Sequence, residues 1–445
     1  MKPKRNPTTL RIPTVSRRLP NGELVELVYD PDAKRTQLAV GQGGAVRLVD
    51  EFALPDGSIL IPYSATNNLI KHEVLLLAQR REEYGVVESL VMDIDAHLSR
   101  YVDLDPEFRI LAVYYILLTW VYDAFNELPY LRFRGQYGSG KTRALLVVGS
   151  LCNRAFFASG ASTVSPIFHT LDTFRGTLLF DEADFRFSDE KAELVKILNN
   201  GNVRGFPVLR TQISQKKEFE PRAFTVFGPK LVAMRRSYED DALESRFFTA
   251  EMGRGALRSD IPINLPDVQR EEARELRNKL LGYRFAMLPE VSADPSLVDP
   301  ALPPRLNQIL VPLLSIVEAD DIREKIRAAV LAQHDARRVK DGDLVEQAAI
   351  RVLSRLRKEG QEKVSVGRIT SLLIDDIGST IDRPLTTRYV GEILRERLDL
   401  RTYKSGGVFV VPLGRPSELA EEKLPSSGVA TPGTTSLPPQ HPPSK

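Results

Sequence analysis

Residues 131–148 decide the fold, and they read Leu-Arg-Phe-Arg-Gly-Gln-Tyr-Gly-Ser-Gly-Lys-Thr-Arg-Ala-Leu-Leu-Val-Val. The first three are typical of a short strand, and the last six favour a helix. Between them, residues 135–142 match the pattern G-x-x-x-x-G-K-[ST] in the strand-to-helix setting that its chemistry requires. Glycines let backbone N–H groups turn toward phosphates, and the helix start adds its positive dipole end. We therefore predict a phosphate-binding loop made of Gly135, Gly138, Ser139, Gly140, Lys141 and Thr142.

Two side chains of this loop carry distinct tasks. Lys141 supplies a mobile positive charge to the β- and γ-phosphates, and Thr142 offers its hydroxyl to Mg²⁺. The sequence thus predicts ATP and Mg²⁺ as the small-molecule partners. The alternative is a glycine-rich turn that matches the pattern by chance.

A second acidic motif follows about 40 residues later. Residues 176–184 read Gly-Thr-Leu-Leu-Phe-Asp-Glu-Ala-Asp, an apolar strand that ends in two carboxylates. Ligands bind at the carboxyl edge of open α/β sheets, so these acids should face the phosphate loop. We expect Asp181 to hold the Mg²⁺ shell and Glu182 to polarise the attacking water. The alternative is a core strand that happens to end in acids.

Composition limits the remaining possibilities. The 445 residues suggest about three domains. With 61 Lys and Arg against 59 Asp and Glu, the net charge of +2 argues against a protein that holds nucleic acid by bulk charge. A single cysteine, Cys152, excludes an intramolecular disulfide framework. The longest apolar stretch, residues 110–122, falls short of the roughly 20 residues of a spanning helix. We expect a cytoplasmic protein without a membrane segment.

The pattern of turns and apolar spacing divides the chain into six parts. Turn signals such as Pro20-Asn21-Gly22 separate short β-type runs near the start, whereas later segments have helical spacing. The predicted parts are a β-rich module (1–63), a helical connector (64–128), an α/β layer (129–264), a helical segment (265–347), a helix–helix–hairpin unit (348–412) and a disordered Pro-rich tail (413–445).

Two further stretches lie in the second half of the α/β layer. Residues 230–234, Lys-Leu-Val-Ala-Met, indicate another core strand, and residues 241–247 read Asp-Ala-Leu-Glu-Ser-Arg-Phe. With these stretches the chain resembles the AAA+ ATPases over about residues 129–252. The resemblance implies that Arg246 is the arginine finger, which reaches the γ-phosphate bound by a neighbouring subunit. The sensor-1 position, where the family has Asn, Thr or a similar polar residue, holds Arg235, which is a departure. Without the resemblance, Arg246 is a surface arginine at a helix end.

The resemblance extends to the helicase or ATPase modules of phage and plasmid replication proteins. It rests on residues 129–131, 138–142, 227–230 and 242–247. In that group an arginine before an apolar helix of the lid faces the nucleotide, which makes Arg305 the sensor-2 candidate. The implied fold class is α/β, an AAA+ P-loop core with a β-rich N-terminal module, a helical lid and a C-terminal winged-helix domain.

Two basic segments are candidates for contact with nucleic acid. Residues 204–219 suggest a hairpin with a basic tip, and in hexameric AAA+ helicases a hairpin in this place lines the central channel. Its candidate residues are Arg210, Lys216 and Lys217, although a solvated loop fits the same pattern. Residues 364–412 resemble a winged-helix domain with candidate DNA contacts at Arg388, Arg395 and Lys404. Many winged-helix domains mediate only protein–protein contacts. That alternative to DNA binding stays open.

Together these features predict an oligomeric AAA+ ATPase that forms a hexamer and acts as a replicative-type DNA helicase or translocase. ATP would bind between subunits, with Lys141, Thr142, Asp181 and Glu182 from one chain and Arg246 from the next. One alternative is an ATP-switched DNA-binding initiator or loader. Another is a protein-remodelling ATPase of a mobile-element or defence system.

Overall fold

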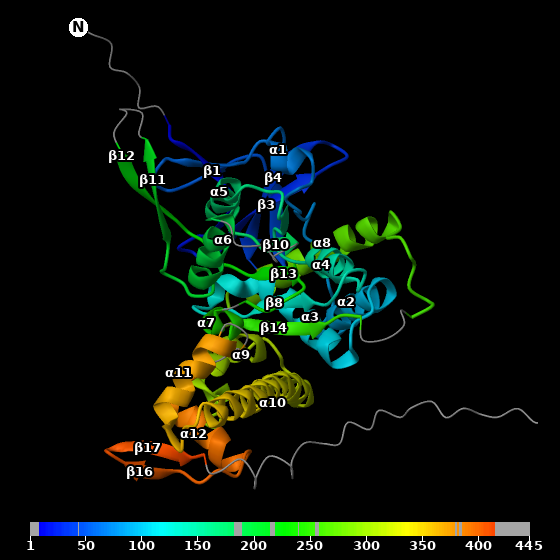
Figure 1. Cartoon of the computed structure of the whole chain (residues 1–445). Coiled ribbons are helices and arrows are strands. Elements are labelled where there is room, and N and C mark those ends of the chain that lie inside the picture. Colours follow the sequence, from blue (N-terminus) through cyan, green and yellow to red (C-terminus); the bar gives the residue numbers. More distant parts are fainter. Residues whose placement is uncertain are drawn as a thin grey trace, which may run out of the picture. The chain divides into compact units, whose positions relative to one another are not determined.

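The structure is a computed structural model that describes residues 9–42, 44–181, 189–213, 219–238, 240–253, 258–378, 381 and 385–413 (Figure 1). Glu182, Lys216, Lys217 and residues 414–445 of the predicted tail lie outside the described residues. The chain forms two compact units, Met1–Arg338 and Val339–Lys445. Among the described helices, none combines the length and the apolar character needed to cross a membrane.

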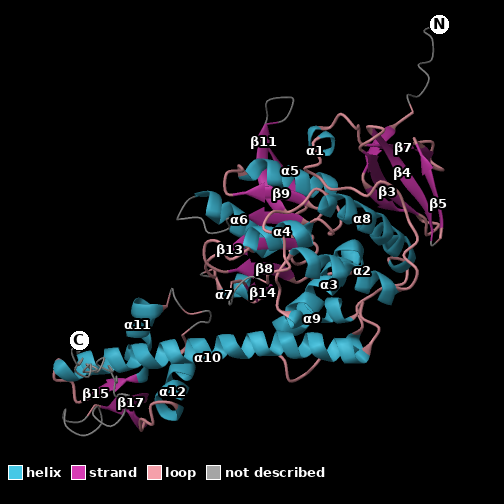
Figure 2. Ribbon diagram, turned by 90° about the vertical axis from the view of Figure 1, so that its right-hand side faces the viewer, coloured by secondary structure: helices cyan, strands magenta, loops and turns pink. Residues whose placement is uncertain are grey.

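Strands fill the first part of the chain, where β-type residues and turn signals predict them. A four-stranded antiparallel sheet has the order β2-β3-β4-β5, and a three-stranded sheet has the order β1-β7-β6 with β1 parallel to β7. Figure 2 shows these strands gathered apart from the parallel sheet. Their bounds are β1 (Arg11–Thr14), β2 (Ser16–Arg18), β3 (Leu24–Asp30), β4 (Arg35–Gln42), β5 (Ala45–Val49), β6 (Phe52–Ala53) and β7 (Ile59–Pro62).

Four short or medium helices connect these strands to the parallel sheet: α1 (Asn68–Lys71), α2 (Val87–Tyr101), α3 (Pro106–Val121) and η1 (Tyr122–Ala124). Asp105 caps α3, because its carboxylate accepts hydrogen bonds from the N–H groups of Glu107 and Phe108. The helix is buried almost all round, and Trp120 donates its indole N–H to the carbonyl of Leu151 at 2.8 Å. This apolar helix is therefore a core element.

The predicted α/β layer is confirmed as a five-stranded parallel sheet with the order β14-β8-β13-β10-β9. Its apolar strands are buried, as a sheet with helical crossovers requires. The strands are β8 (Tyr130–Arg134), β9 (Phe156–Ser159), β10 (Leu178–Asp181), β13 (Lys230–Met234) and β14 (Phe247–Glu251). The helices between them are α4 (Lys141–Gly149), α5 (Val164–Phe174), α6 (Asp189–Asn200) and α7 (Asp241–Glu244). The order places β13 between the strand of the phosphate loop and the acidic strand.

A buried ion pair joins β8 to α7, the helix that precedes the edge strand β14. Arg132, in the middle of β8, donates Nη2–H to Glu244 of α7 at 2.7 Å, and Nη1 also binds this carboxylate. Both side chains are fully buried. The Nε–H of Arg132 donates to the hydroxyl of Thr249 at 3.0 Å, so this arginine joins β8, α7 and β14.

A separate hairpin lies between β10 and β13 in the chain, although these two strands pair directly in the sheet. It consists of β11 (Val208–Ile213) and β12 (Phe219–Phe224), which pair antiparallel in the region where the sequence suggests a hairpin. After β14 the chain is helical, with α8 (Val268–Met287), η2 (Pro295–Leu297), α9 (Pro304–Leu314) and α10 (Asp320–Lys358). The boundary predicted at residues 347 and 348 falls inside α10. No proline interrupts residues 320–358, so the helix continues across it.

The second unit has its own core. Beyond α10 it contains β15 (Lys363–Ser365), α11 (Val366–Ile377), α12 (Thr387–Glu396), β16 (Tyr403–Ser405) and β17 (Val408–Pro412). The strands form a sheet with the order β15-β17-β16. On α12 one apolar face is buried through Val390, Ile393 and Leu394. The two helices and the following hairpin are present where the sequence predicts them, whereas β15 is an additional strand.

Candidate nucleotide-binding site

The glycine-rich loop has the backbone that its sequence requires. Gly138 and Gly140 have φ angles of +72° and +87°, in the left-handed region that favours glycine. Gly140 precedes the first residue of α4, so the loop leads directly into a helix N-terminus. A Cβ on Gly135 would lie 2.6 Å from the hydroxyl oxygen of Ser139. The tight fold of the loop therefore depends on glycine at these positions.

The loop brings a hydroxyl and a carboxylate together beside it. The hydroxyl of Thr142 donates to Oδ2 of Asp181 at 2.7 Å. This contact joins the start of α4 to the end of β10, across the carboxyl edge of the sheet. Hydroxyl and carboxylate oxygens suit Mg²⁺, which protein sites commonly hold with one or two carboxylates and substrate phosphates. Among the described residues, no group of three or more His, Cys, Asp or Glu could hold a metal by itself. The site thus fits a metal that arrives with a phosphate ligand.

Two further atoms of the loop fit an anionic ligand. The ammonium group of Lys141 donates to the carbonyl of Gln136 at 2.7 Å, so the lysine curls over its own loop. The hydroxyl oxygen of Ser139 is buried and has no hydrogen-bond partner within the described part of the chain. A buried hydroxyl without a partner is unusual in proteins, and an added ligand oxygen would satisfy it.

Arg235 lies at the same edge of the sheet. It follows β13, and its guanidinium carbon is 4.5 Å from the ring centroid of Tyr137, a residue of the glycine-rich loop. The Tyr137 side chain is 80% exposed, so the arginine is held beside the loop by a stacking contact at the surface. The residue at the sensor-1 position is therefore within the neighbourhood of the phosphate loop.

Arg246 lies at the opposite, amino edge of the sheet. It is buried, with Nε–H donating to Oδ1 of Asn202 and Nη1–H to Oδ1 of Asn199, each at 2.8 Å. Nη1 also donates to the carbonyl of Ala242. The carbonyl of Arg246 accepts from the N–H of Tyr130, the first residue of β8, at 2.8 Å. One length of β8, about 15 Å at about 3.3 Å per residue, thus separates Arg246 from the loop of its own chain.

Arg305 lies near Arg246. Burial is the main cause that lowers the pKa of Arg246, and the positive charge of Arg305 is the next. The structure therefore groups the finger and sensor-2 candidates, two arginines that the sequence separates by almost 60 positions.

Arg210 of the hairpin is held within its own chain. Its guanidinium binds the carboxylate of Glu193 on α6, and it stacks on Phe168 of α5 at 4.4 Å from the ring centroid. These contacts attach the base of the hairpin to the helices. The other two hairpin candidates, Lys216 and Lys217, are not among the described residues.

The candidates of the second unit are exposed. Arg388 is 91% exposed and forms an ion pair with Glu392 one turn along α12, at 3.4 Å. Arg395 is also exposed on this helix. Lys404 of β16 lies over the ring of Phe409 at 5.6 Å. Arg397, by contrast, is bound to Asp343 at 2.7 Å and serves the packing of the unit.

Sequence reasoning missed Gly253, which packs against the glycine-rich loop. Gly253, just after β14, has a φ of +77°, and a Cβ there would lie 2.7 Å from the Cβ of Ser139. The signal that could identify it is a glycine at the carboxyl end of a strand that neighbours the loop strand. That neighbour relation requires the strand order, which the sequence pattern does not contain.

Comparisons with known proteins add little to this geometry. No family model and no curated protein matches the chain. Among solved structures, the apo C-terminal region of NrS-1 is 11% identical, with 88% of this chain and 97% of that chain covered and a TM-score of 0.34. The JCV helicase is 17% identical, with 56% and 61% covered and a TM-score of 0.25. The Aeropyrum pernix ORC1 protein in complex with DNA is 14% identical, with 72% and 92% covered and a TM-score of 0.22. At these TM-scores the matches do not establish a shared fold.

Proposed function

We propose that this chain is an ATP-hydrolysing, oligomeric AAA+ motor that acts on DNA as a helicase or translocase of replicative type. The observation that carries the proposal is the contact between Thr142 and Asp181 beside a phosphate loop at the carboxyl edge of a parallel sheet. This arrangement of a loop, a hydroxyl and a carboxylate suits a nucleoside triphosphate with its metal.

The individual roles follow from the positions of the side chains. Lys141 and the loop N–H groups would bind the phosphates, and Thr142 with Asp181 would hold Mg²⁺. The metal would neutralise charge on the phosphates when it is bound. Glu182 would orient the attacking water, and Arg235 would contribute positive charge at the same edge of the sheet. A preorganised site of this kind acts mainly by placing charge where the transition state develops it.

The position of Arg246 supports a site shared between subunits. Its own loop is about 15 Å away along β8, so a catalytic role requires the loop of another chain. Arg305 lies near it, which adds a second positive charge to the surface that would meet the neighbour. A head-to-tail ring joins these two unlike surfaces in every interface, and a hexamer is the proposed form.

Contact with DNA is proposed for the hairpin tip, through Lys216 and Lys217, and for the second unit, through Arg388, Arg395 and Lys404. The exposed arginines on α12 also fit the second candidate function, an ATP-switched DNA-binding initiator or loader. In that case the second unit would recognise a duplex, and ATP would control assembly.

The test combines ATPase rates with and without single-stranded DNA and the mass of the particle in ATP. Lys141→Ala and Asp181→Ala should abolish hydrolysis, whereas Lys71→Ala, an exposed lysine on α1, should not change it. Stimulation by single-stranded DNA and strand displacement on a fork would support the helicase. Footprinting of a specific duplex without unwinding would favour the initiator. An ATPase that ignores DNA and responds only to a protein would contradict action on DNA.

A further inference from the structure

A cavity lies at the amino edge of the parallel sheet. It has a volume of about 520 Å³, and its lining includes β2, η1 and the residues just before β9, β10 and β13. Segments that lead into parallel strands lie at the edge opposite the carboxyl ends, so this cavity is separate from the glycine-rich loop. Its lining contains six arginines and one acid: Arg17, Arg18, Arg154, Arg175, Arg204, Arg284 and Asp123.

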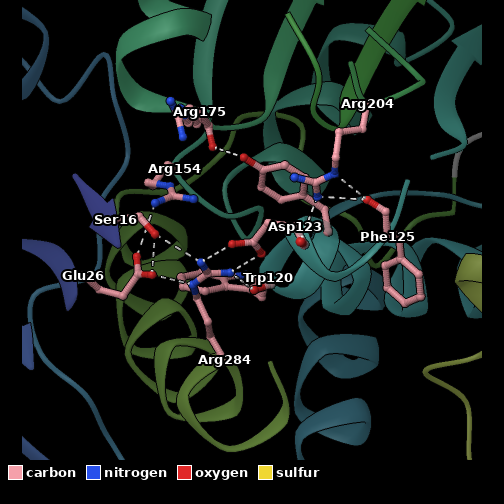
Figure 3. A network of polar contacts seen from close by, with 10 residues as sticks. Ser16, Glu26, Trp120, Asp123, Phe125, Arg154, Arg175, Arg204 and Arg284 are labelled. Carbon is pink, nitrogen blue, oxygen red and sulfur yellow. Dashed lines mark hydrogen bonds and ion pairs between the residues drawn. The ribbon is translucent and has the colours of Figure 1, made fainter. Parts of the chain in front are cut away.

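The floor of the cavity is a buried network around Arg284 of α8 (Figure 3). Arg284 donates Nη2–H to Asp123 at 2.7 Å and Nε–H to Glu26 at 2.8 Å. Burial would lower the pKa of Arg284, but the charges of Asp123 and Glu26 outweigh it and raise the pKa. The guanidinium therefore stays charged, and both carboxylates near the cavity are engaged by it.

Arg154 has unused hydrogen-bonding capacity at this floor. Its side chain is 4% exposed, and Nη1–H donates to Glu26 at 3.3 Å. Its Nε–H is buried and has no hydrogen-bond partner among the residues that the structure describes. Because Glu26 already accepts from Arg284, one carboxylate serves two guanidinium groups here. An anion in the cavity would supply the acceptor that Arg154 lacks.

The rim carries exposed arginines that form no ion pair within the described parts of the chain. The guanidinium groups of Arg17, Arg18 and Arg175 form no hydrogen bond or ion pair there, and all three residues are exposed. The side chain of Arg204 donates to neutral carbonyl oxygens, those of Asp123 and Phe125, at 2.8 and 2.9 Å. Figure 3 shows Arg154, Arg175, Arg204 and Arg284 gathered around Asp123. The cavity is therefore strongly positive in a chain that is nearly neutral.

A smaller cavity adjoins this one. It has a volume of about 360 Å³ and shares Ser16, Arg17 and Arg175 with the larger cavity. Arg222 of β12 also lines it, so the path leads along the base of the hairpin. Two adjoining hollows suit an extended chain of charges better than a compact anion.

The two adjoining cavities, which share Arg17 and Arg175, form what we call the arginine groove. We propose that the arginine groove binds the phosphodiester backbone of a single nucleic-acid strand. The inference rests on the DNA-acting part of the proposed function and deepens it with a binding surface. The aromatic rings of the lining already contact other side chains. Phe227 lies under Arg204 at 4.8 Å and packs against Tyr122 at 5.9 Å, and Tyr63 packs against Phe174 at 5.3 Å, each measured to a ring centroid. Contacts to phosphates therefore dominate over base stacking, and such contacts do not read sequence.

The experiment measures fluorescence anisotropy of a labelled single-stranded oligonucleotide across a salt series. The oligonucleotide has about 20 nucleotides, which is more than one OB fold usually covers on a single strand. The variant combines Arg17→Gln, Arg18→Gln and Arg175→Gln, which disturb no ion pair. The matched control is Arg270→Gln, an exposed arginine of α8 without an ion pair among the described residues. Thermal unfolding checks that both variants keep the fold.

We expect the triple variant to bind at least tenfold more weakly and to lose about 2 from its log–log salt slope, since each phosphate contact contributes about 0.7 on single strands. If the native chain binds no single strand, the DNA-acting part of the proposed function fails, and this inference fails with it. If the native chain binds and the triple variant matches it, only the groove is refuted. Free tripolyphosphate is the other source of the same chemistry. If micromolar tripolyphosphate fully displaces the oligonucleotide from the native chain, the ligand is a small anion. The proposal that the groove binds a nucleic-acid strand is then refuted.

Discussion

Arg246 offers the sharpest test of a shared site, because the sheet separates it from the glycine-rich loop of its own chain. The perturbation is a mixture of two inactive variants. Arg246→Ala keeps the loop and loses the arginine, whereas Lys141→Ala keeps the arginine and loses the loop lysine. If the arginine acts on the neighbouring chain, an interface can receive its intact loop from the first variant and its intact arginine from the second.

The expected recovery follows from counting interfaces. In an equimolar random ring about one interface in four has both intact parts, whatever the number of subunits. Loss of an arginine finger slows hydrolysis on the order of 10³–10⁵-fold. Mixing should therefore raise ATPase activity from near background to about a quarter of the native rate per site, if the sites act independently.

Stability must be separated from catalysis in this experiment. Removing Arg246 leaves the side-chain oxygens of Asn199 and Asn202 without their donors, and a buried unsatisfied group costs about 1–3 kcal/mol. Urea unfolding of Arg246→Ala and of Arg246→Lys, which retains a charge, measures this loss directly. Recovery in the mixture shows that the alanine variant folds. If both variants are folded and oligomeric and the mixture is no more active than either alone, the shared site is refuted.

Three further predictions concern the support of the site and the core. Gly253→Ala should weaken ATP binding, since a left-handed alanine costs about 1–2 kcal/mol and its Cβ would press on Ser139; titration calorimetry measures the change, and native affinity would contradict the reasoning. Glu244→Gln should lower the free energy of unfolding by about 3–5 kcal/mol, because it breaks a fully buried ion pair by removing one of its two charges; a loss below 1 kcal/mol in urea would disprove this role. Burial lowers the pKa of Lys230 from 10.5 to about 7, so between these values the unfolded chain binds the extra proton and stability rises with pH. The unfolding free energy of the native chain minus that of Lys230→Met should therefore grow by up to about 1.4 kcal/mol per pH unit from pH 7 to 9. If this difference does not change with pH, the pKa of Lys230 is not lowered.

The parts of the site that lie close together in the sequence could be predicted. The glycine-rich loop is a contiguous pattern, and Gly138 and Gly140 in it have positive φ angles that suit glycine. The contact of Thr142 with Asp181 follows from a general rule, because carboxyl ends of parallel strands meet at one edge. Neither inference needs the order of the strands.

Features that depend on strand order could not be predicted. Arg132 is a charge in the middle of a core strand, and its partner Glu244 is 112 positions away. Only the pairing of β8 with β14 brings them together. The arginine groove has the same origin, because its lining comes from segments spread over some 270 positions. The net charge of +2 contains no sign of it, since acids elsewhere in the chain cancel its arginines.

The helix α6 gives the two edges of the sheet a physical connection. The chain enters α6 shortly after Asp181 at the carboxyl edge, and near its end Asn199 binds both Arg246 and Asp240 at the amino edge. For Arg246 to engage a neighbouring nucleotide, its hydrogen bonds to Asn199 and Asn202 must be exchanged for bonds to phosphate. A shift of α6 that accompanies nucleotide binding would weaken the first of these bonds. In the proposed ring, ATP at one site would thus release the arginine that completes the next site, which is a route for sequential hydrolysis between subunits.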